Sequence, residues 1–90
     1  MRFEWDELKN RINVQEHGIS FEETTKIFEQ PTLTWFDDGG LYGEDRYIAI
    51  GFVGAVLATV VFVQKSDHVT RIISARKATR HEEQQYERGY

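Results

Sequence analysis

Three polar residues near the N-terminus have a spacing that could support acid–base chemistry. Lys9, Asn13 and His17 occur at every fourth position, so on a helix their side chains would lie along one face. An imidazole titrates near neutral pH and can act as an acid or a base, which makes His17 a candidate catalytic residue. The alternative is structural, because a cation at the C-terminus of a helix interacts favourably with the helix dipole.

Arginines supply a second set of candidates, because a guanidinium can clamp a phosphate through two parallel hydrogen bonds. The set consists of Arg46, Arg71, Arg76 and Arg80. Arg76 and Arg80 share a helix face only if the last helix starts by Arg76. Arg71 and Arg76 are an odd number of positions apart, so an unbroken strand would point them to opposite sides, and they converge only if the strand ends near Ala75. The alternative for Arg46 is an arginine at a sheet edge that either extends its charged end to solvent or pairs with a carboxylate.

Four carboxylates within nine residues offer a different chemistry, the binding of a divalent metal ion. They are Asp37, Asp38, Glu44 and Asp45. A solvated loop is the simpler interpretation and the one we prefer. The chain has no cysteine, its three histidines at positions 17, 68 and 81 are scattered, and no P-loop, EF-hand or HExxH motif occurs. We therefore expect no metal ion and no cofactor.

Two helices that would position the N-terminal candidates are predicted from caps and from apolar spacing. The first spans 7–17, with Asp6 as its N-cap and Gly18 ending it. The second spans 20–29, opens with a capping box and cannot continue through Pro31. The residues expected on the apolar side of the first helix are Trp5, Leu8 and Ile12.

The apolar period changes to two after Pro31, which predicts strands. We expect strands at 3–5, 32–36, 45–52, 56–64 and 69–75, and a last helix at 77–88. The strand at 56–64 is apolar on both faces, so it should be central, with Phe62 buried and Val61 on the opposite face. The predicted order is β-α-α-β-β-β-β-α, an α+β fold with two N-terminal helices on one face of a twisted, mainly antiparallel sheet.

Length and charge limit the kind of protein this is. Ninety residues predict a single domain, 1–90. The net charge of −4 conceals an asymmetry: the first 45 residues carry four Lys and Arg against eleven Asp and Glu, whereas the last 45 carry seven against four. Such a chain can present one cationic face to a polyanion. No apolar stretch is long enough to span a membrane and no signal peptide is recognisable, so we expect a cytoplasmic protein.

Two blocks of residues stand out when the chain is taken as a whole. The first is Trp5-Asp6-x-x-Lys9, Asn13 and His17-Gly18-x-Ser20-Phe21-Glu22-Glu23, followed by Glu44-x-Arg46. The second is Arg71-Ile72-Ile73-Ser74-Ala75-Arg76-x-Ala78-Thr79-x-x-Glu82, with Tyr86. Together they resemble the BrnT family of type II toxins, whose fold is RelE-like. The resemblance implies a ribonuclease that arrests growth and is neutralised by a BrnA-type ribbon-helix-helix antitoxin.

These observations lead to one main hypothesis and one alternative. The main hypothesis is a metal-independent endoribonuclease toxin with His17, Arg46, Arg76 and Arg80 in catalysis and Lys9, Arg71 and Lys77 on the RNA. Tyr86 would contact the antitoxin in a complex with two copies of each chain, and operator DNA would be bound only through the antitoxin. The alternative is a catalytically silent protein- or nucleic-acid-binding module that acts only through a partner.

Overall fold

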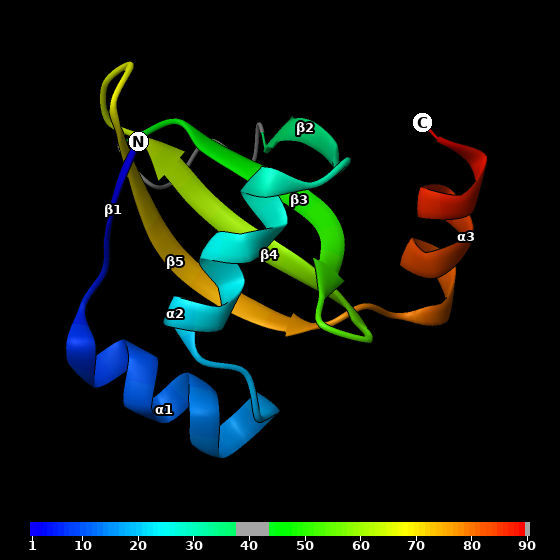
Figure 1. Cartoon of the computed structure of the whole chain (residues 1–90), viewed down its shortest axis with the longest axis horizontal. Coiled ribbons are helices and arrows are strands. Elements are labelled where there is room, and N and C mark those ends of the chain that lie inside the picture. The colour runs from blue at the N-terminus through cyan, green and yellow to red at the C-terminus, as the bar shows by residue number, and fades with distance from the viewer. Residues whose placement is uncertain (38–43, 90) are drawn as a thin grey trace.

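The computed structural model describes residues 1–37 and 44–89, and there the fold is α+β with a five-stranded sheet (Figure 1). The strands are β1 (Arg2–Glu4), β2 (Leu33–Asp37), β3 (Arg46–Val53), β4 (Val56–Gln64) and β5 (Val69–Lys77). The helices are α1 (Glu7–His17), α2 (Phe21–Thr24) and α3 (Arg80–Arg88), with a 3-10 helix, η1 (Thr25–Glu29), directly after α2. The sheet order is β1-β5-β4-β3-β2, in which β1 is parallel to β5 and the other pairs are antiparallel.

Helix α1 has the predicted bounds, but the apolar side expected for it is wrong. The carboxylate of Asp6 caps it by accepting from the backbone N–H groups of Leu8 and Lys9, and Gly18 ends it at a φ of 71°. Leu8 and Ile12 are exposed, and only Trp5, which precedes the helix, packs partly buried against the core. Two asparagines, Asn10 and Asn13, are the buried residues of the helix. The helix therefore buries amide groups where the periodicity predicts an apolar stripe.

Asn13 is buried because α1 packs beside the edge of β5 that faces away from β4, where only the short β1 is paired. Asn13 Oδ1 accepts from the N–H of Ala75 in β5 at 3.2 Å, and its Nδ2 donates to the carbonyl of Ile19 at 2.9 Å. Asn10 Oδ1 accepts from the N–H of Phe21 at 2.8 Å. These amides satisfy backbone groups that would otherwise be buried without a hydrogen bond.

The second predicted helix, 20–29, is present as one turn of α-helix followed by the 3-10 helix η1. Its capping box forms as expected, since Ser20 and Glu23 each bond the other's backbone N–H. The hydroxyl of Thr25 then donates to the carbonyl of Glu22 at 2.7 Å. Such local side-chain bonds compete with α-helical bonding, and the helix tightens at this residue.

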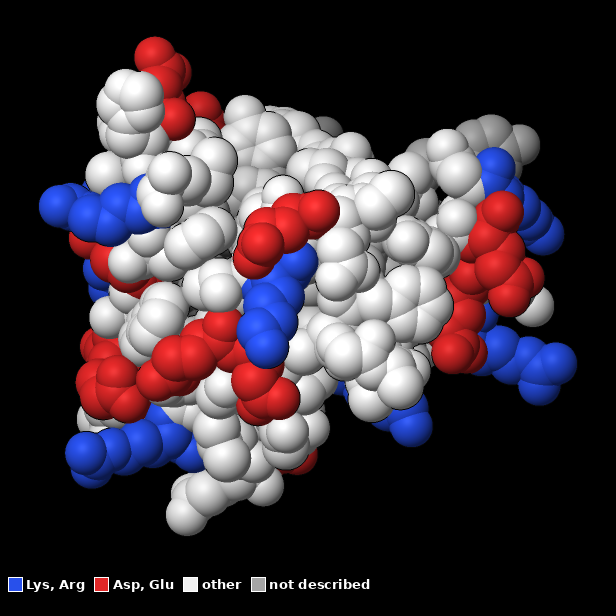
Figure 2. Space-filling model, viewed as in Figure 1, with Lys and Arg blue, Asp and Glu red and all other residues white. Residues whose placement is uncertain are grey.

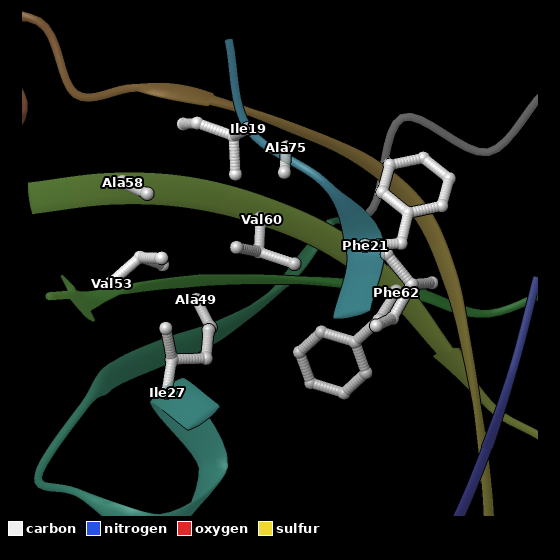
Figure 3. Close-up of a cluster of buried hydrophobic side chains, with 10 residues drawn as sticks. Ile19, Phe21, Ile27, Ala49, Val53, Ala58, Val60, Phe62 and Ala75 are labelled. Carbon is white, nitrogen blue, oxygen red and sulfur yellow. The ribbon is translucent and has the colours of Figure 1, made fainter. Parts of the chain in front are cut away.

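The core lies between the sheet and the segment formed by α2 and η1 (Figures 1 and 3). Phe21 and Ile27 project from that segment toward Val60 and Phe62 of β4, and all four are buried. The prediction that β4 is central and buries Phe62 is confirmed. Gly51 of β3 lies directly under η1, because a Cβ there would come within 3.3 Å of the Ile27 Cβ.

The end of the last strand and the start of the last helix both come later in the chain than predicted. Strand β5 continues to Lys77, pairing Arg76 with Thr59 and Lys77 with Ala58, and α3 begins only at Arg80. Thr79 is the N-cap of α3 and forms a capping box with Glu82. Arg76 is therefore a strand residue and Arg80 a helix residue, so the helix face that the two could have shared does not exist.

One side of the sheet is covered by α2 and η1, and Figure 2 views the molecule from that side. Acidic side chains gather there over the region of α1 and α2, where Glu7, Glu22 and Glu23 lie in first helical turns. The opposite side of the sheet carries the arginines described below. No helix in the described residues is long and apolar enough to cross a membrane.

Candidate functional site

The strand register places Arg46 and Arg71 on the same side of the sheet. Arg46 of β3 and Arg71 of β5 both lie opposite Val63 of the central strand β4. Side chains of directly paired residues project from the same face of a sheet. Val63 is buried but is not part of the core cluster against α2 and η1, so this row lies on the opposite side. We call the side that carries Arg46, Arg71 and Arg76 the arginine face.

Arg76 joins this face because of a β-bulge in β5. Arg76 pairs with Thr59, which is four residues from Val63 on the unbroken strand β4, so Thr59 and Val63 face the same way. The register shifts between Val61 and Phe62, so β5 uses one more residue than β4 over this stretch. The prediction that Arg71 and Arg76 converge only if the strand ends near Ala75 was wrong, because the bulge inverts the alternation within a continuous strand.

Arg46 and Arg71 each form an ion pair with a carboxylate of the same chain. Arg71 lies 3.8 Å from the carboxylate of Glu4, which is also 3.5 Å from Lys65 Nζ. Arg46 lies 3.7 Å from Glu44, and its side chain is only 22% exposed. The alternative interpretation of Arg46, a carboxylate partner, is thus confirmed, although β3 is not an edge strand. Both arginine–carboxylate distances are longer than a direct hydrogen bond between a guanidinium and a carboxylate.

Arg76 makes the tightest ion pair of the described residues. Its Nη1 and Nη2 donate to Oε1 and Oε2 of Glu82 at 2.7 and 2.9 Å. Glu82 also accepts from the Thr59 hydroxyl and from the Thr79 N–H, both at 2.9 Å. The bond from Arg76 is the main reason that the pKa of Glu82 falls to about 2, and the same bond raises the pKa of Arg76.

Glu82 was not among the candidates chosen from the sequence. The signal for it was present, because Thr79-x-x-Glu82 has the spacing of a capping box. That pattern predicts where α3 begins and where the Glu82 carboxylate folds back. The additional contact with Arg76 depends on where β5 ends, which the pattern does not reveal.

The remaining candidates lie away from this pair. His17 is at the C-terminal end of α1, 39% exposed, with its Nε2 3.7 Å from the Glu16 carboxylate. Among the described residues, no hydrogen bond or ion pair joins it to an arginine. Lys9, Lys77 and Arg80 are exposed. The structure therefore brings Arg46, Arg71 and Arg76 onto one face and leaves His17 on a separate element.

Tyr86 packs within the molecule. Its hydroxyl donates to the carbonyl of Pro31 at 3.1 Å, and its ring meets that of Phe52 edge-on at 5.6 Å. A hollow of about 250 Å³ beside it is lined by Pro31, Leu33 and Gly89 among others. Tyr86 and Glu82 thus attach the two ends of α3 to the sheet, although α3 has no buried residue.

The acidic segment gives no metal-binding geometry within the described residues. Asp38 lies outside them, Asp37 belongs to β2, and Glu44 lies beside Arg46. No group of three or more His, Asp or Glu side chains with metal-binding geometry is found in residues 1–37 and 44–89.

The chain is similar to known ribonuclease toxins. A family model described as the ribonuclease toxin BrnT of type II toxin–antitoxin systems matches residues 5–82. Among solved structures, the ribonuclease toxin BrnT of Brucella abortus is similar, with a TM-score of 0.68 and 27% sequence identity. The match covers 89% of this chain and 99% of the Brucella chain. A search of curated proteins finds no match.

Proposed function

The chain belongs to the BrnT family of ribonuclease toxins of type II toxin–antitoxin systems, and on that premise we propose that it cleaves RNA on the arginine face without a metal ion or cofactor. The observation that supports the proposal is that three arginines from two strands, Arg46, Arg71 and Arg76, lie on one face of the sheet. Arg76 lies on the same face as the other two because of a bulge in β5, a feature often found beside active sites.

The chemistry needs three contributions. A base must take the proton of the attacking 2′-hydroxyl, cations must offset the charge that grows on the phosphorane, and an acid must protonate the leaving 5′-oxygen. Arg76 is our choice for the phosphorane, since its guanidinium is held by a short bidentate pair. Arg46 and Arg71, with loosely paired carboxylates, would bind the flanking backbone. Arg80, exposed at the start of α3, would extend this contact. Lys77 pairs with Ala58 of the core cluster, so its side chain projects from the other side of the sheet and would reach RNA only where the RNA passes the end of β5.

His17 remains the candidate acid–base group from the sequence. It is exposed and can reach solvent, but it lies on α1, so RNA bound to the arginine face would have to extend around the β5 edge to meet it. Replacing His17 with Gln tests this role. A fall in kcat of about 100-fold or more would support it, whereas unchanged cleavage would place proton transfer elsewhere. Lys9 lies on the same helix, and its proposed contact with RNA is tested separately by Lys9→Ala, which should raise KM.

The decisive experiment is cleavage of RNA by the purified chain. Arg76→Ala removes the central guanidinium, and Arg88→Ala is the matched control, because Arg88 is an exposed arginine in the last turn of α3. We expect cleavage by the wild type and by Arg88→Ala, and a loss of about 100-fold or more in Arg76→Ala. No cleavage by the wild type would favour a catalytically silent binding module. Equal cleavage by all three would remove Arg76 from the site.

The partner that we propose is a BrnA-type ribbon-helix-helix antitoxin, since membership of a type II toxin family implies an antitoxin. Its DNA-binding part would be dimeric, giving two copies of each chain, with operator DNA bound only through the antitoxin. It would act in the cytoplasm by covering part of the segment from Arg71 to Arg80 or Tyr86. Co-expression followed by light scattering tests this proposal, and a bound complex that cleaves RNA as fast as the free chain would contradict it.

A further inference from the structure

We infer that Glu82 is a positioning residue: it holds one edge of the Arg76 guanidinium so that the other edge is presented to an RNA phosphate. The inference rests on the proposed function and adds to it the way in which the key arginine is oriented. It starts from the number and direction of the hydrogen bonds that the guanidinium makes.

The guanidinium of Arg76 has five N–H groups, and three of them are used among the described residues. Nη1 donates to Glu82 Oε1 at 2.7 Å and to the carbonyl of Lys77 at 3.3 Å, and Nη2 donates to Glu82 Oε2 at 2.9 Å. The Nε–H and the second Nη2–H are left. These two groups are parallel and adjacent, because Nη2 is the terminal nitrogen on the Nε–H side. They form a second fork with the geometry that a phosphate accepts.

The second fork can be reached by a ligand. The Arg76 side chain is 42% exposed, whereas that of Glu82 is only 14% exposed. The carboxylate therefore lies behind the guanidinium, toward the protein, and binds the edge away from Nε. A phosphate can approach Arg76 without displacing Glu82.

The Glu82 carboxylate is itself held by groups from separate elements. The Thr59 hydroxyl from the centre of β4 and the Thr79 N–H at the start of α3 both bond to Oε1 at 2.9 Å. Thr59 is 3% exposed, so this anchor is buried. A fixed carboxylate removes rotamer freedom from an otherwise flexible arginine, and a side chain fixed in advance loses less entropy when it binds the transition state.

The test is a comparison of Glu82→Gln with Phe52→Leu on a fluorophore–quencher RNA oligonucleotide of mixed sequence. Gln keeps an oxygen for Thr59 and Thr79 but offers Arg76 only one acceptor and no charge. Phe52→Leu weakens the other attachment of α3, at Tyr86, without touching Arg76. We expect Glu82→Gln to lower kcat about 10- to 100-fold with KM within about threefold, and Phe52→Leu to leave both nearly unchanged.

A double-mutant cycle with Arg76→Lys separates positioning from general loosening of α3. Lys has no fork for Glu82 to orient, so Glu82→Gln should cost less than about threefold in the Arg76→Lys background. Equal losses in both backgrounds, or an equal loss in Phe52→Leu, would overturn the inference. The proposed function fails separately, if the wild type cleaves no RNA.

Discussion

Replacing Asn13 with Ala should lower the free energy of unfolding substantially. A polar residue of an amphipathic helix usually faces solvent and contributes little to stability, but Asn13 is buried. The side chain joins three segments, since it belongs to α1, donates to the carbonyl of Ile19 and accepts from the N–H of Ala75 in β5. It is 6% exposed. Ala would leave one buried carbonyl and one buried N–H without partners.

The magnitude follows from the two groups left behind. A buried backbone group that loses its hydrogen bond costs about 1–3 kcal/mol, so the two together should lower the free energy of unfolding by about 2–6 kcal/mol. A chain of this length has roughly 5–13 kcal/mol in total. The change is therefore a large part of the stability of the fold, although it removes no apolar side chain.

The matched control is Lys9→Ala, an exposed residue one turn earlier on the same helix. We expect it to stay within about 0.5 kcal/mol of the wild type. Urea unfolding followed by circular dichroism measures both variants, and unchanged m-values would show that the two-state comparison is valid. If Asn13→Ala costs no more than Lys9→Ala, the asparagine bridge to β5 does not stabilise the fold and our account of the α1 burial is wrong.

Three further predictions concern the core, the Arg76–Glu82 pair and toxicity. Phe62→Ala should lower the free energy of unfolding by about 3–5 kcal/mol, and a cost under about 1 kcal/mol in urea unfolding would contradict a central β4. Because the pKa of Glu82 is held at about 2 against an ordinary 4.5, its contribution to stability is complete above pH 4.5 and is lost as the pH falls toward 2. Glu82→Gln should therefore flatten the dependence of the melting temperature on pH over that interval, and an unchanged profile would argue against the ion pair. Arg76→Ala and Arg80→Ala should each abolish growth arrest on expression with near-wild-type circular dichroism, Lys should rescue only in part, and full toxicity of the Ala variants would make these residues structural or antitoxin contacts.

Local signals in the sequence predicted much of the fold. The N-cap Asp6 and the end at Gly18 gave the bounds of α1, and the apolar run of β4 gave the central strand. Such signals depend on residues a few positions apart and need no knowledge of the tertiary arrangement. The capping box at Ser20 was equally local. The change from α2 to η1 was not predicted, although it coincides with another local bond, from the Thr25 hydroxyl to the Glu22 carbonyl.

Features set by pairing between distant segments were not predictable. The bulge in β5 depends on how β4 and β5 align, and only that alignment reveals that Arg71 and Arg76 share a face. Likewise, Asn13 is buried because it accepts a hydrogen bond from the backbone of β5. The spacing of residues along α1 does not reveal that contact. The candidate arginines were therefore found by residue type, but their geometry required the structure.

RNA cleavage by the chain's own residues, without a metal ion, can be measured from the ends of the RNA products formed in excess EDTA. Attack by the 2′-hydroxyl, assisted by guanidinium and acid–base groups alone, predicts undiminished cleavage and products with 2′,3′-cyclic phosphate or 3′-phosphate ends. Loss of cleavage in EDTA that Mg²⁺ or Mn²⁺ restores, with 3′-hydroxyl ends, would contradict the account and move the chemistry from the arginine face to the carboxylates around Glu44.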